Sequence, residues 1–104
     1  MTSRVRFEDE ADAEYRAAAR WYEGRRTGLA LEFFDAVDAA VRQIVDLPRA
    51  GAKVPRLPTS LPVRRIPVKR FPYHVVYLEE SAAIRVLALA HDRRKPGYWK
   101  SRLP

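Results

Sequence analysis

The second half of the chain holds cationic and aromatic side chains that could act on a phosphodiester. Cleavage of RNA without a metal ion needs a base for the 2′-hydroxyl, positive charge for the phosphorane and an acid for the leaving 5′-oxygen. The side chains that offer such groups are Arg65, Lys69, His91, Arg94 and Tyr98. If the protein is a metal-independent ribonuclease, we expect its catalytic residues to be Arg65, His91, Arg94 and Tyr98.

Both histidines also have structural interpretations. His91, at the end of an expected strand, could do acid–base work or could bond a backbone carbonyl through its ring. His74 lies inside an expected strand beside Tyr73, where packing is the favoured role. Two histidines with no cysteine and no HxxxH spacing predict no metal site, and the sequence indicates no cofactor.

The chain ends in a basic tail that interleaves cations with aromatic rings. Such a composition suits contact with nucleic acid and also the hot spots of protein interfaces. The alternative is that Trp99 folds back to cover the sheet. The residues expected to bind a target are Arg93, Arg94, Lys95, Tyr98 and Trp99.

Charge divides the sequence into two halves. Residues 1–48 hold 7 basic and 10 acidic side chains, a balance of −3, whereas residues 49–104 hold 13 basic and 3 acidic ones, a balance of +10. This division indicates an acidic partner for the second half, either nucleic acid or an acidic protein segment. A basic face that only keeps the protein soluble is the alternative.

Length and composition favour one domain over residues 1–104, because 47% hydrophobic side chains can form a packed interior. The chain has no cysteine, no leader-like apolar run at its start and no stretch long enough to span a bilayer. We therefore expect a soluble cytoplasmic protein.

The first half predicts a strand and two helices. Residues 4–7 alternate as a strand does, and a helical period then runs from about Asp9 to Gly24. A second helix, with Thr27 as its expected cap, ends before Pro48. Its buried stripe is expected to be Ala30, Phe34, Val37, Val41 and Ile44, widened by Phe33 and Ala40.

The second half predicts a proline-rich loop and three strands. The loop covers residues 48–62, and the strands cover residues 63–68, 73–78 and 83–90. Pro67 cannot donate to a ladder, so its strand should lie at an edge or carry a bulge. The expected fold class is α+β, with a two-helix hairpin packed on a four-stranded antiparallel sheet and a short basic C-terminal tail.

Four segments of the chain carry a resemblance to known proteins. They are Ala19-Arg20-Trp21-Tyr22, the strands Val63-Arg64-Arg65 and Arg70-Phe71-Pro72-Tyr73-His74-Val75-Val76-Tyr77, and the final stretch from Leu87 to Trp99. In this order they resemble the RelE/ParE toxin superfamily, and more closely its ParE-like branch of plasmid stabilisation toxins. The similarity covers about residues 4–102.

The resemblance implies the toxin of a type II toxin–antitoxin system in bacteria. A cognate antitoxin would then bind through an extended segment, and the residues expected to contact it are Arg64, Arg65, Lys69 and Arg70. ParE-like members act on DNA gyrase, and RelE-like members cleave messenger RNA on the ribosome. The RelE pattern includes paired lysines, but here Lys53 stands alone.

We therefore predict an inhibitor of DNA gyrase that acts by binding rather than by catalysis, and in this context we favour the structural role of His91. The alternative is a RelE-like ribosome-associated endonuclease. A second alternative is a nucleic-acid-binding module without toxicity. The charge of the second helix argues against its insertion into a DNA groove. The helix has one basic residue, Arg42, and four acidic ones, Glu32, Asp35, Asp38 and Asp46.

Overall fold

The structure is a computed structural model that describes residues 4–58 and 60–104. Thr59, in the predicted proline-rich loop, and residues 1–3 lie outside the described residues. The elements are β1 (Arg4–Phe7), α1 (Asp9–Arg25), α2 (Leu29–Asp46), β2 (Ala52–Lys53), β3 (Val63–Pro67), β4 (Tyr73–Glu80), β5 (Ala83–His91) and a short 3-10 turn at Lys100–Arg102. No helix in the described part of the chain is long and apolar enough to cross a membrane.

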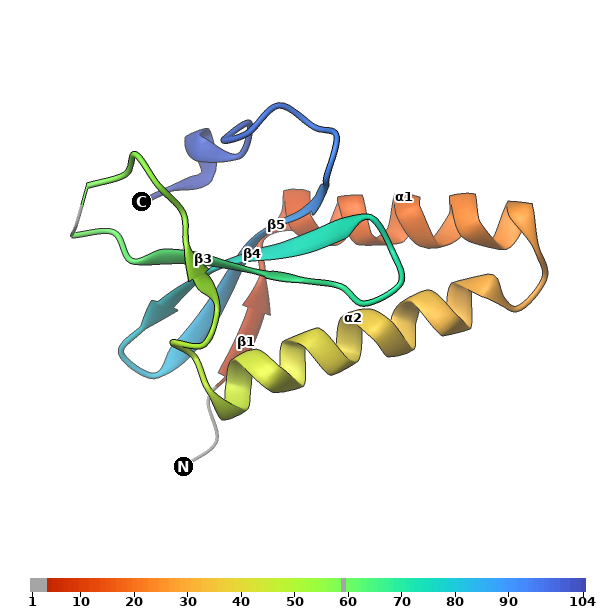
Figure 1. Ribbon diagram of the computed structural model, residues 1–104, viewed down its shortest axis with the longest axis horizontal. Helices are drawn as coiled ribbons and strands as arrows, with labels where there is room; N and C mark the ends of the chain where they lie inside the picture. Colours follow the sequence, from red (N-terminus) through yellow and green to blue (C-terminus); the bar gives the residue numbers. More distant parts are fainter. Residues whose placement is uncertain (1–3, 59) are drawn as a thin grey trace.

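The α+β class is confirmed, with a helical hairpin packed on one sheet (Figure 1). The sheet has five strands in the order β1-β5-β4-β3-β2, where four antiparallel strands were expected. The extra strand, β2, pairs only Ala52 and Lys53 with β3. β1 runs parallel to β5, from Arg4 opposite Ala83 to Phe7 opposite Val86, so the sheet is mixed. Alternation along a strand shows which residues share a face but not the direction of the neighbouring strand.

The turn between the helices differs from the expected one. α1 continues through Gly24 to Arg25, and Gly28, with φ of 90°, takes the left-handed conformation at the start of α2. The Glu23 carboxylate caps α2 in place of Thr27, because it accepts hydrogen bonds from the backbone N–H groups of Gly28 and Ala30, at 3.0–3.1 Å. These two bonds lower the pKa of Glu23 from its usual 4.5.

The buried face of α2 is centred on Phe33. Its ring packs against Tyr22, Phe71 and Tyr73, with centroid distances of 5.1–5.5 Å. Phe34, expected in the stripe, is 38% exposed and meets only the edge of Tyr15 among the rings of the described residues. The buried residues of α2 are Phe33, Ala36, Val37, Ala40 and Ile44, so the stripe is rotated toward Phe33.

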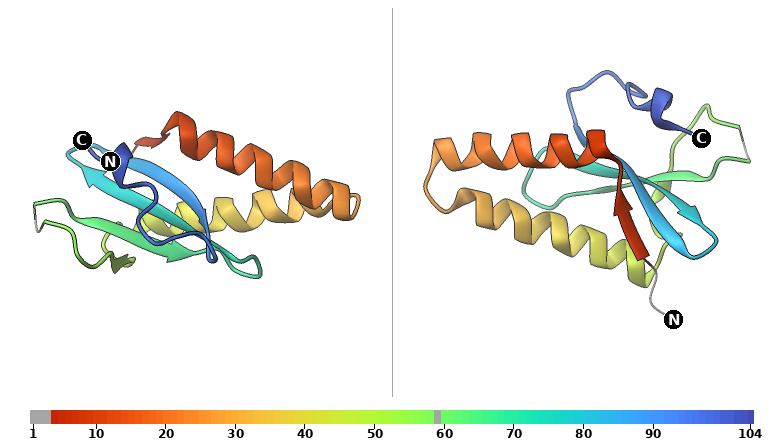
Figure 2. Two further views of the ribbon diagram at one scale, coloured as in Figure 1. Left: turned by 90° about the horizontal axis from the view of Figure 1, so that it is seen from above. Right: turned by 180° about the vertical axis from the view of Figure 1, so that it is seen from behind.

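A second core lies on the opposite face of the sheet. In Figure 2, α1 and the loop between β2 and β3 lie on opposite sides of the strands. A bulge in β5 contributes to this face: Tyr77 pairs with Val86 and Val76 pairs with Ala88, so Leu87 is an extra residue. Leu87 and Ala88 therefore belong to the same core, whereas Ile84 and Val86, before the bulge, belong to the core under the helices. Its buried members are Val63, Val76, Leu78, Leu87, Ala88, Ala90 and Trp99.

Pro67 lies at an edge of the sheet, which is one of the two positions that the sequence allowed for it. β2 pairs with Arg64 and Arg65 and ends before it reaches Pro67, so the missing N–H of Pro67 costs no ladder bond on that side.

Candidate functional site

The C-terminal tail, residues 92–104, leaves β5 and folds back over the sheet face that carries the second core. Trp99 is 3% exposed within that core, beside Val76 and Ala88. The alternative in which Trp99 covers the sheet is thus the one observed. As a core residue, Trp99 is not available as the target-binding side chain that the sequence suggested.

Glu14 of α1 ties this tail to the rest of the fold. It accepts a hydrogen bond from the Tyr98 hydroxyl at 2.5 Å and two from the Arg102 guanidinium at 2.9 and 3.1 Å. It also accepts one from the backbone N–H of Leu89 at 3.1 Å. Arg102 in turn donates to the carbonyl of Leu87 at 2.9 Å. Because β1 ends opposite Val86, these side chains satisfy the edge of β5 that β1 leaves open.

Sequence reasoning missed Glu14. A signal was present, since Glu14 lies three residues after Ala11 and four before Ala18, which are both on the buried stripe of α1. An acidic residue at the border of such a stripe needs buried partners. Arg102 is its partner, and the two side chains are 18% and 13% exposed.

Tyr98 is held at the centre of this cluster. The Arg94 guanidinium lies over its ring at 3.9 Å from the centroid, and Arg102 lies at 5.2 Å. Burial, followed by the hydrogen bond to Glu14, raises the pKa of the Tyr98 hydroxyl well above its usual value. The hydroxyl is therefore neutral at ordinary pH and donates its proton to Glu14.

A cationic cleft lies between the tail and the loop that follows β2. Its volume is about 490 Å³, its floor includes Val76 and Ala90, and residues 54–56 and 94–100 form its walls. All four candidate catalytic residues line this cleft: Arg65, His91, Arg94 and Tyr98. The fold therefore brings together residues that lie up to 33 positions apart in the sequence.

The two histidines on this cleft are both engaged. His91 Nδ1 accepts a hydrogen bond from the backbone N–H of Arg93 at 3.0 Å, and its ring meets Tyr73 edge-on at 5.0 Å. The His91 ring thus bonds the backbone, with an N–H group as its partner where a carbonyl was expected. His74 Nδ1 lies 2.9 Å from a carboxylate oxygen of Asp92, so His74 does more than pack.

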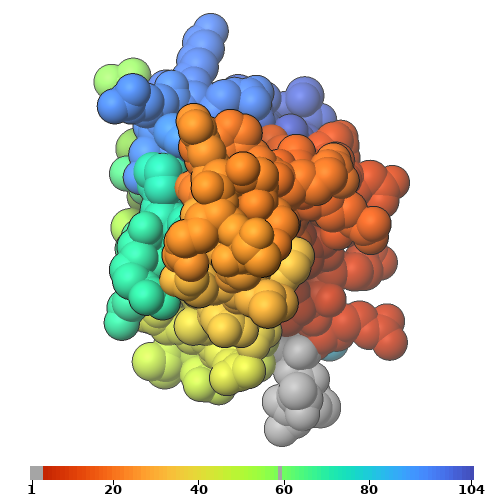
Figure 3. Space-filling view, turned by 90° about the vertical axis from the view of Figure 1, so that its right-hand side faces the viewer, coloured from red at the N-terminus to blue at the C-terminus, as the bar shows by residue number. Residues whose placement is uncertain are grey.

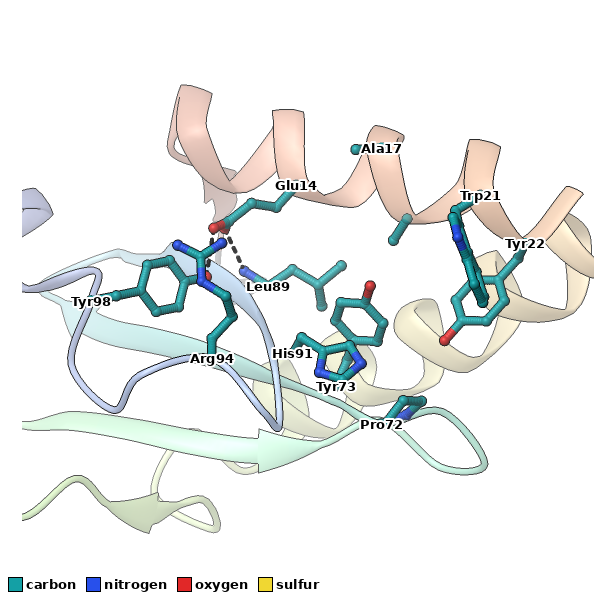
Figure 4. Close-up of a pocket in the computed structure, with 11 residues that line it drawn as sticks. Glu14, Ala17, Trp21, Tyr22, Pro72, Tyr73, Leu89, His91, Arg94 and Tyr98 are labelled. Atoms are coloured by element: carbon teal, nitrogen blue, oxygen red, sulfur yellow. Dashed lines mark hydrogen bonds between the residues drawn. The ribbon is translucent and has the colours of Figure 1, made fainter. Parts of the chain in front are cut away.

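An apolar groove lies on the other side of Tyr98, between α1 and the ends of β4 and β5 (Figure 4). Its volume is about 470 Å³, and Ala17, Trp21, Tyr73 and Leu89 line it together with Arg94. Trp21 is 57% exposed, and the Arg25 guanidinium lies 4.4 Å from its ring centroid, whereas the neighbouring Tyr22 is buried. A half-exposed tryptophan at the end of an apolar groove is suited to contact with another protein.

The four cations expected to contact an antitoxin lie in β3 and in the turn that follows it. Arg64 donates to the carbonyl of Gly51 at 2.9 Å and is partly buried, whereas Arg65 is exposed and lines the cationic cleft. Lys69 and Arg70 lie in the turn between β3 and β4. In Figure 3 that turn lies beside the turn of the helical hairpin, with the start of the tail above both.

The sequence profile described as "ParE toxin of type II toxin-antitoxin system, parDE" matches residues 5–96. The chain therefore belongs to the ParE toxin family, within the RelE/ParE superfamily. A chain of the chromosomal ParDE toxin–antitoxin system from P. aeruginosa has a similar fold, with a TM-score of 0.67 and 18% sequence identity over 86% of this chain and 96% of that one. A comparison with curated protein sequences finds no match.

Proposed function

We propose that this toxin inhibits DNA gyrase by binding it and is neutralised by a cognate antitoxin. Family membership supports the toxin role. The choice of binding over RNA cleavage rests on one observation, the hydrogen bond from the Tyr98 hydroxyl to Glu14. A general acid or base must reach the proton that it transfers. Here the only tyrosine of the tail donates its hydroxyl proton to Glu14, a residue that does not line the cleft.

The remaining cleft residues form an incomplete set. His91 Nδ1 accepts from the Arg93 backbone, which leaves Nε2 as the one ring atom of His91 that could transfer a proton, and Arg94 lies over the Tyr98 ring. Arginine stabilises charge but stays protonated, so it supplies neither the base nor the acid that phosphodiester cleavage requires. A surface that only binds a target needs neither an acid nor a base. Exposed Arg93 and Lys95 at the start of the tail provide positive charge for such a surface.

We place the antitoxin in the apolar groove. Trp21 and Leu89 offer apolar area to an amphipathic segment, and Arg94 at the rim can meet its acidic side chains. Such a segment would also shield the tail from a larger target. The antitoxin to test is the product of the adjacent open reading frame.

A supercoiling assay with purified gyrase, run beside a cleavage assay with ribosome-bound messenger RNA, tests the proposal. Inhibition of supercoiling without cut RNA is the expected result. Lys95→Glu should weaken inhibition about thirtyfold, as loss of about 2 kcal/mol at a hot spot would. Arg42→Glu, on the outer side of α2, makes the same charge change away from the tail and should leave inhibition unaltered.

His91→Gln separates the two functions further. Binding should survive this change because the His91 ring has a local structural role. Two results together would establish the RelE-like alternative and exclude gyrase. They are loss of toxicity in a folded His91→Gln protein and cut messenger RNA in cells that produce the unaltered toxin.

A further inference from the structure

We infer that a small pocket beside the turn between β3 and β4 receives an apolar side chain of the target protein, and that Arg70 pairs with a carboxylate next to that side chain. The identity of the target rests on the proposed function. The chemistry of its contact residues is read from the pocket itself, which lies apart from the cationic cleft and supplies a contact that the tail does not.

The pocket lies between the start of α2 and the turn that joins β3 to β4. Its volume is about 310 Å³, and Leu29, Phe71 and Pro72 line it together with Tyr22. The Phe71 ring meets the edge of Tyr22 at 4.9 Å and that of Phe33 at 5.1 Å, so the core fixes the aromatic wall. Phe71 and Leu29 are only half-buried, which leaves apolar surface open to one more large side chain.

Arg70 gives this pocket a free positive charge. It is exposed, and it has no carboxylate partner among the described residues. The acidic residue that lines the pocket, Glu32, is already paired with Arg26 at 2.7 Å. The pocket thus combines apolar surface with one unpaired guanidinium, which suits an apolar side chain that has a carboxylate beside it.

The backbone of Arg70 also indicates a use for its side chain. Arg70 has φ of 71°, in the left-handed region that glycine and asparagine adopt more readily. The tight turn accounts for the left-handed conformation but does not require a long cationic side chain there. Because arginine costs free energy at this position relative to glycine, its charge is the better reason for its presence.

The charges around the pocket favour a protein segment over a nucleic acid. A nucleic acid carries a phosphate at every nucleotide, and its binding depends on several cations along the strand. Among the described residues that line the pocket, Arg70 alone is free, and the Glu32 carboxylate would repel a phosphate. One guanidinium is enough for one carboxylate, which it can hold with two parallel hydrogen bonds. We therefore expect an aspartate or glutamate directly beside the apolar side chain of the target.

The pocket adjoins the surface proposed for the target. The backbone N–H of Asp92, at the start of the tail, donates to the carbonyl of Pro72 at 2.8 Å, so the tail leaves the sheet beside this turn. In Figure 3 the turn, the end of the helical hairpin and the start of the tail lie together. The apolar groove assigned to the antitoxin shares Tyr22 and Pro72 with the pocket but is otherwise lined by different residues. A target that binds the exposed Arg93 can therefore reach the pocket at the same end of the molecule.

Titration of the full chain with N-acetyl-phenylalanine, a ring with a carboxylate beside it, tests the chemistry of the pocket. The probe should shift the backbone amide NMR signals of Leu29 and Phe71, and N-acetyl-phenylalanine amide, which lacks the charge, should bind about fivefold more weakly. Arg70→Asn should reduce the affinity for the acid to that for the amide and leave the affinity for the amide unaltered. Asparagine tolerates the left-handed backbone, and Arg70→Gly should give the same loss. Lys69→Asn is the matched control, because Lys69 is an exposed neighbouring cation that does not line the pocket.

Three results of this titration would overturn the proposal. They are the absence of shifts at Leu29 and Phe71, equal affinity of the unaltered chain for the acid and the amide, and tighter binding of thymidine monophosphate than of the acid. Equal weakening by Lys69→Asn would also overturn it, because the attraction would then belong to net charge alone.

The supercoiling assay tests the occupant. Arg70→Asn should raise the toxin concentration needed to inhibit gyrase about fivefold, Lys69→Asn should not, and both variants should bind the antitoxin as the unaltered toxin does. Loss of antitoxin binding with full inhibition of gyrase would assign the pocket to the antitoxin and overturn the proposal. If the unaltered toxin does not inhibit gyrase, the proposed function fails and gyrase is excluded as the occupant. The titration, which contains no gyrase, decides the chemistry of the pocket separately.

Discussion

Replacing Glu14 by alanine should release the tail and destabilise the whole domain. The carboxylate accepts four hydrogen bonds, from the Leu89 backbone, the Tyr98 hydroxyl and the Arg102 guanidinium. No other acidic side chain in the described residues contacts Tyr98 or Arg102. The three donors would therefore lose their acceptor together.

The expected cost is about 3 kcal/mol. Removing one partner of a buried ion pair typically costs about 3–5 kcal/mol, and a buried donor left unsatisfied costs about 1–3 kcal/mol. Because the Glu14 and Arg102 side chains are 18% and 13% exposed, water can reach the freed groups, which places the loss at the lower end of the first range. For a domain of this length that loss lowers the melting temperature by roughly 12–24 °C. Glu14→Gln keeps an acceptor oxygen but loses the charge, so about half the cost is expected.

Tryptophan fluorescence can follow the tail separately from the core. The chain has two tryptophans, so in a Trp21→Phe background Trp99 is the only one. Its buried indole should emit at longer wavelength in Glu14→Ala already at low urea, before the helices unfold by circular dichroism. Glu10→Gln is the control, as it neutralises an exposed carboxylate one turn earlier on α1. An unchanged unfolding midpoint and unchanged Trp99 emission in Glu14→Ala would refute the role given to Glu14.

Three further predictions concern packing and pH. In urea unfolding, Phe33→Ala should cost about 3–5 kcal/mol and Phe34→Ala less than half of that, since only Phe33 is enclosed; equal costs would contradict the observed rotation of α2. Because the raised pKa of Tyr98 keeps its proton on in the folded state, while the unfolded chain releases it near pH 10, the free energy of unfolding should fall as pH rises above about 10. Tyr98→Phe should flatten that fall, and an unaltered slope would contradict the assignment. The lowered pKa of Glu23 contributes stability above pH 4.5 that is lost as pH falls through the folded-state pKa, so Glu23→Gln should remove this acid sensitivity from thermal melts between pH 2 and 6.

The sequence predicts the order and approximate bounds of the long elements because local signals determine them. Helical spacing from Asp9 and the stop at Pro48 place α1 and α2 within a residue or two, and alternating apolar residues place β3, β4 and β5. Features that depend on contacts between distant residues were not predicted. The parallel pairing of β1 with β5 joins residues 79 positions apart, such as Arg4 and Ala83, and no local pattern contains it. The choice between Phe33 and Phe34 likewise depends on Phe71 and Tyr73, which reach the helix only in the folded protein.

For the candidate site, the sequence predicted which residues come together better than it predicted what each of them does. Arg65, His91, Arg94 and Tyr98 do line one cleft, since cations and aromatics on a sheet and its tail converge once the tail folds back. Their roles depend on partners that spacing does not reveal. Tyr98 is directed to Glu14, 84 positions earlier, and Trp99 is buried by strands that precede it. The tail thus has an exposed cationic side and a buried aromatic side, and the burial of Trp99 was one of the two alternatives that the sequence left open.

This division of the tail also accounts for the unequal charge of the two halves of the chain. Carboxylates of the first half pair with cations of both halves, as in Glu14 with Arg102 and Glu8 with Arg85, and so hold the fold together. The paired cations thus have a structural role, whereas those around the cleft keep an uncompensated field. A neutralising partner would need to add acidic groups where the first half supplies none. In residues 49–104, whose charge balance is +10, the cations around the cleft are therefore exposed to a ligand or target, whereas the Tyr98 hydroxyl is hydrogen-bonded to Glu14.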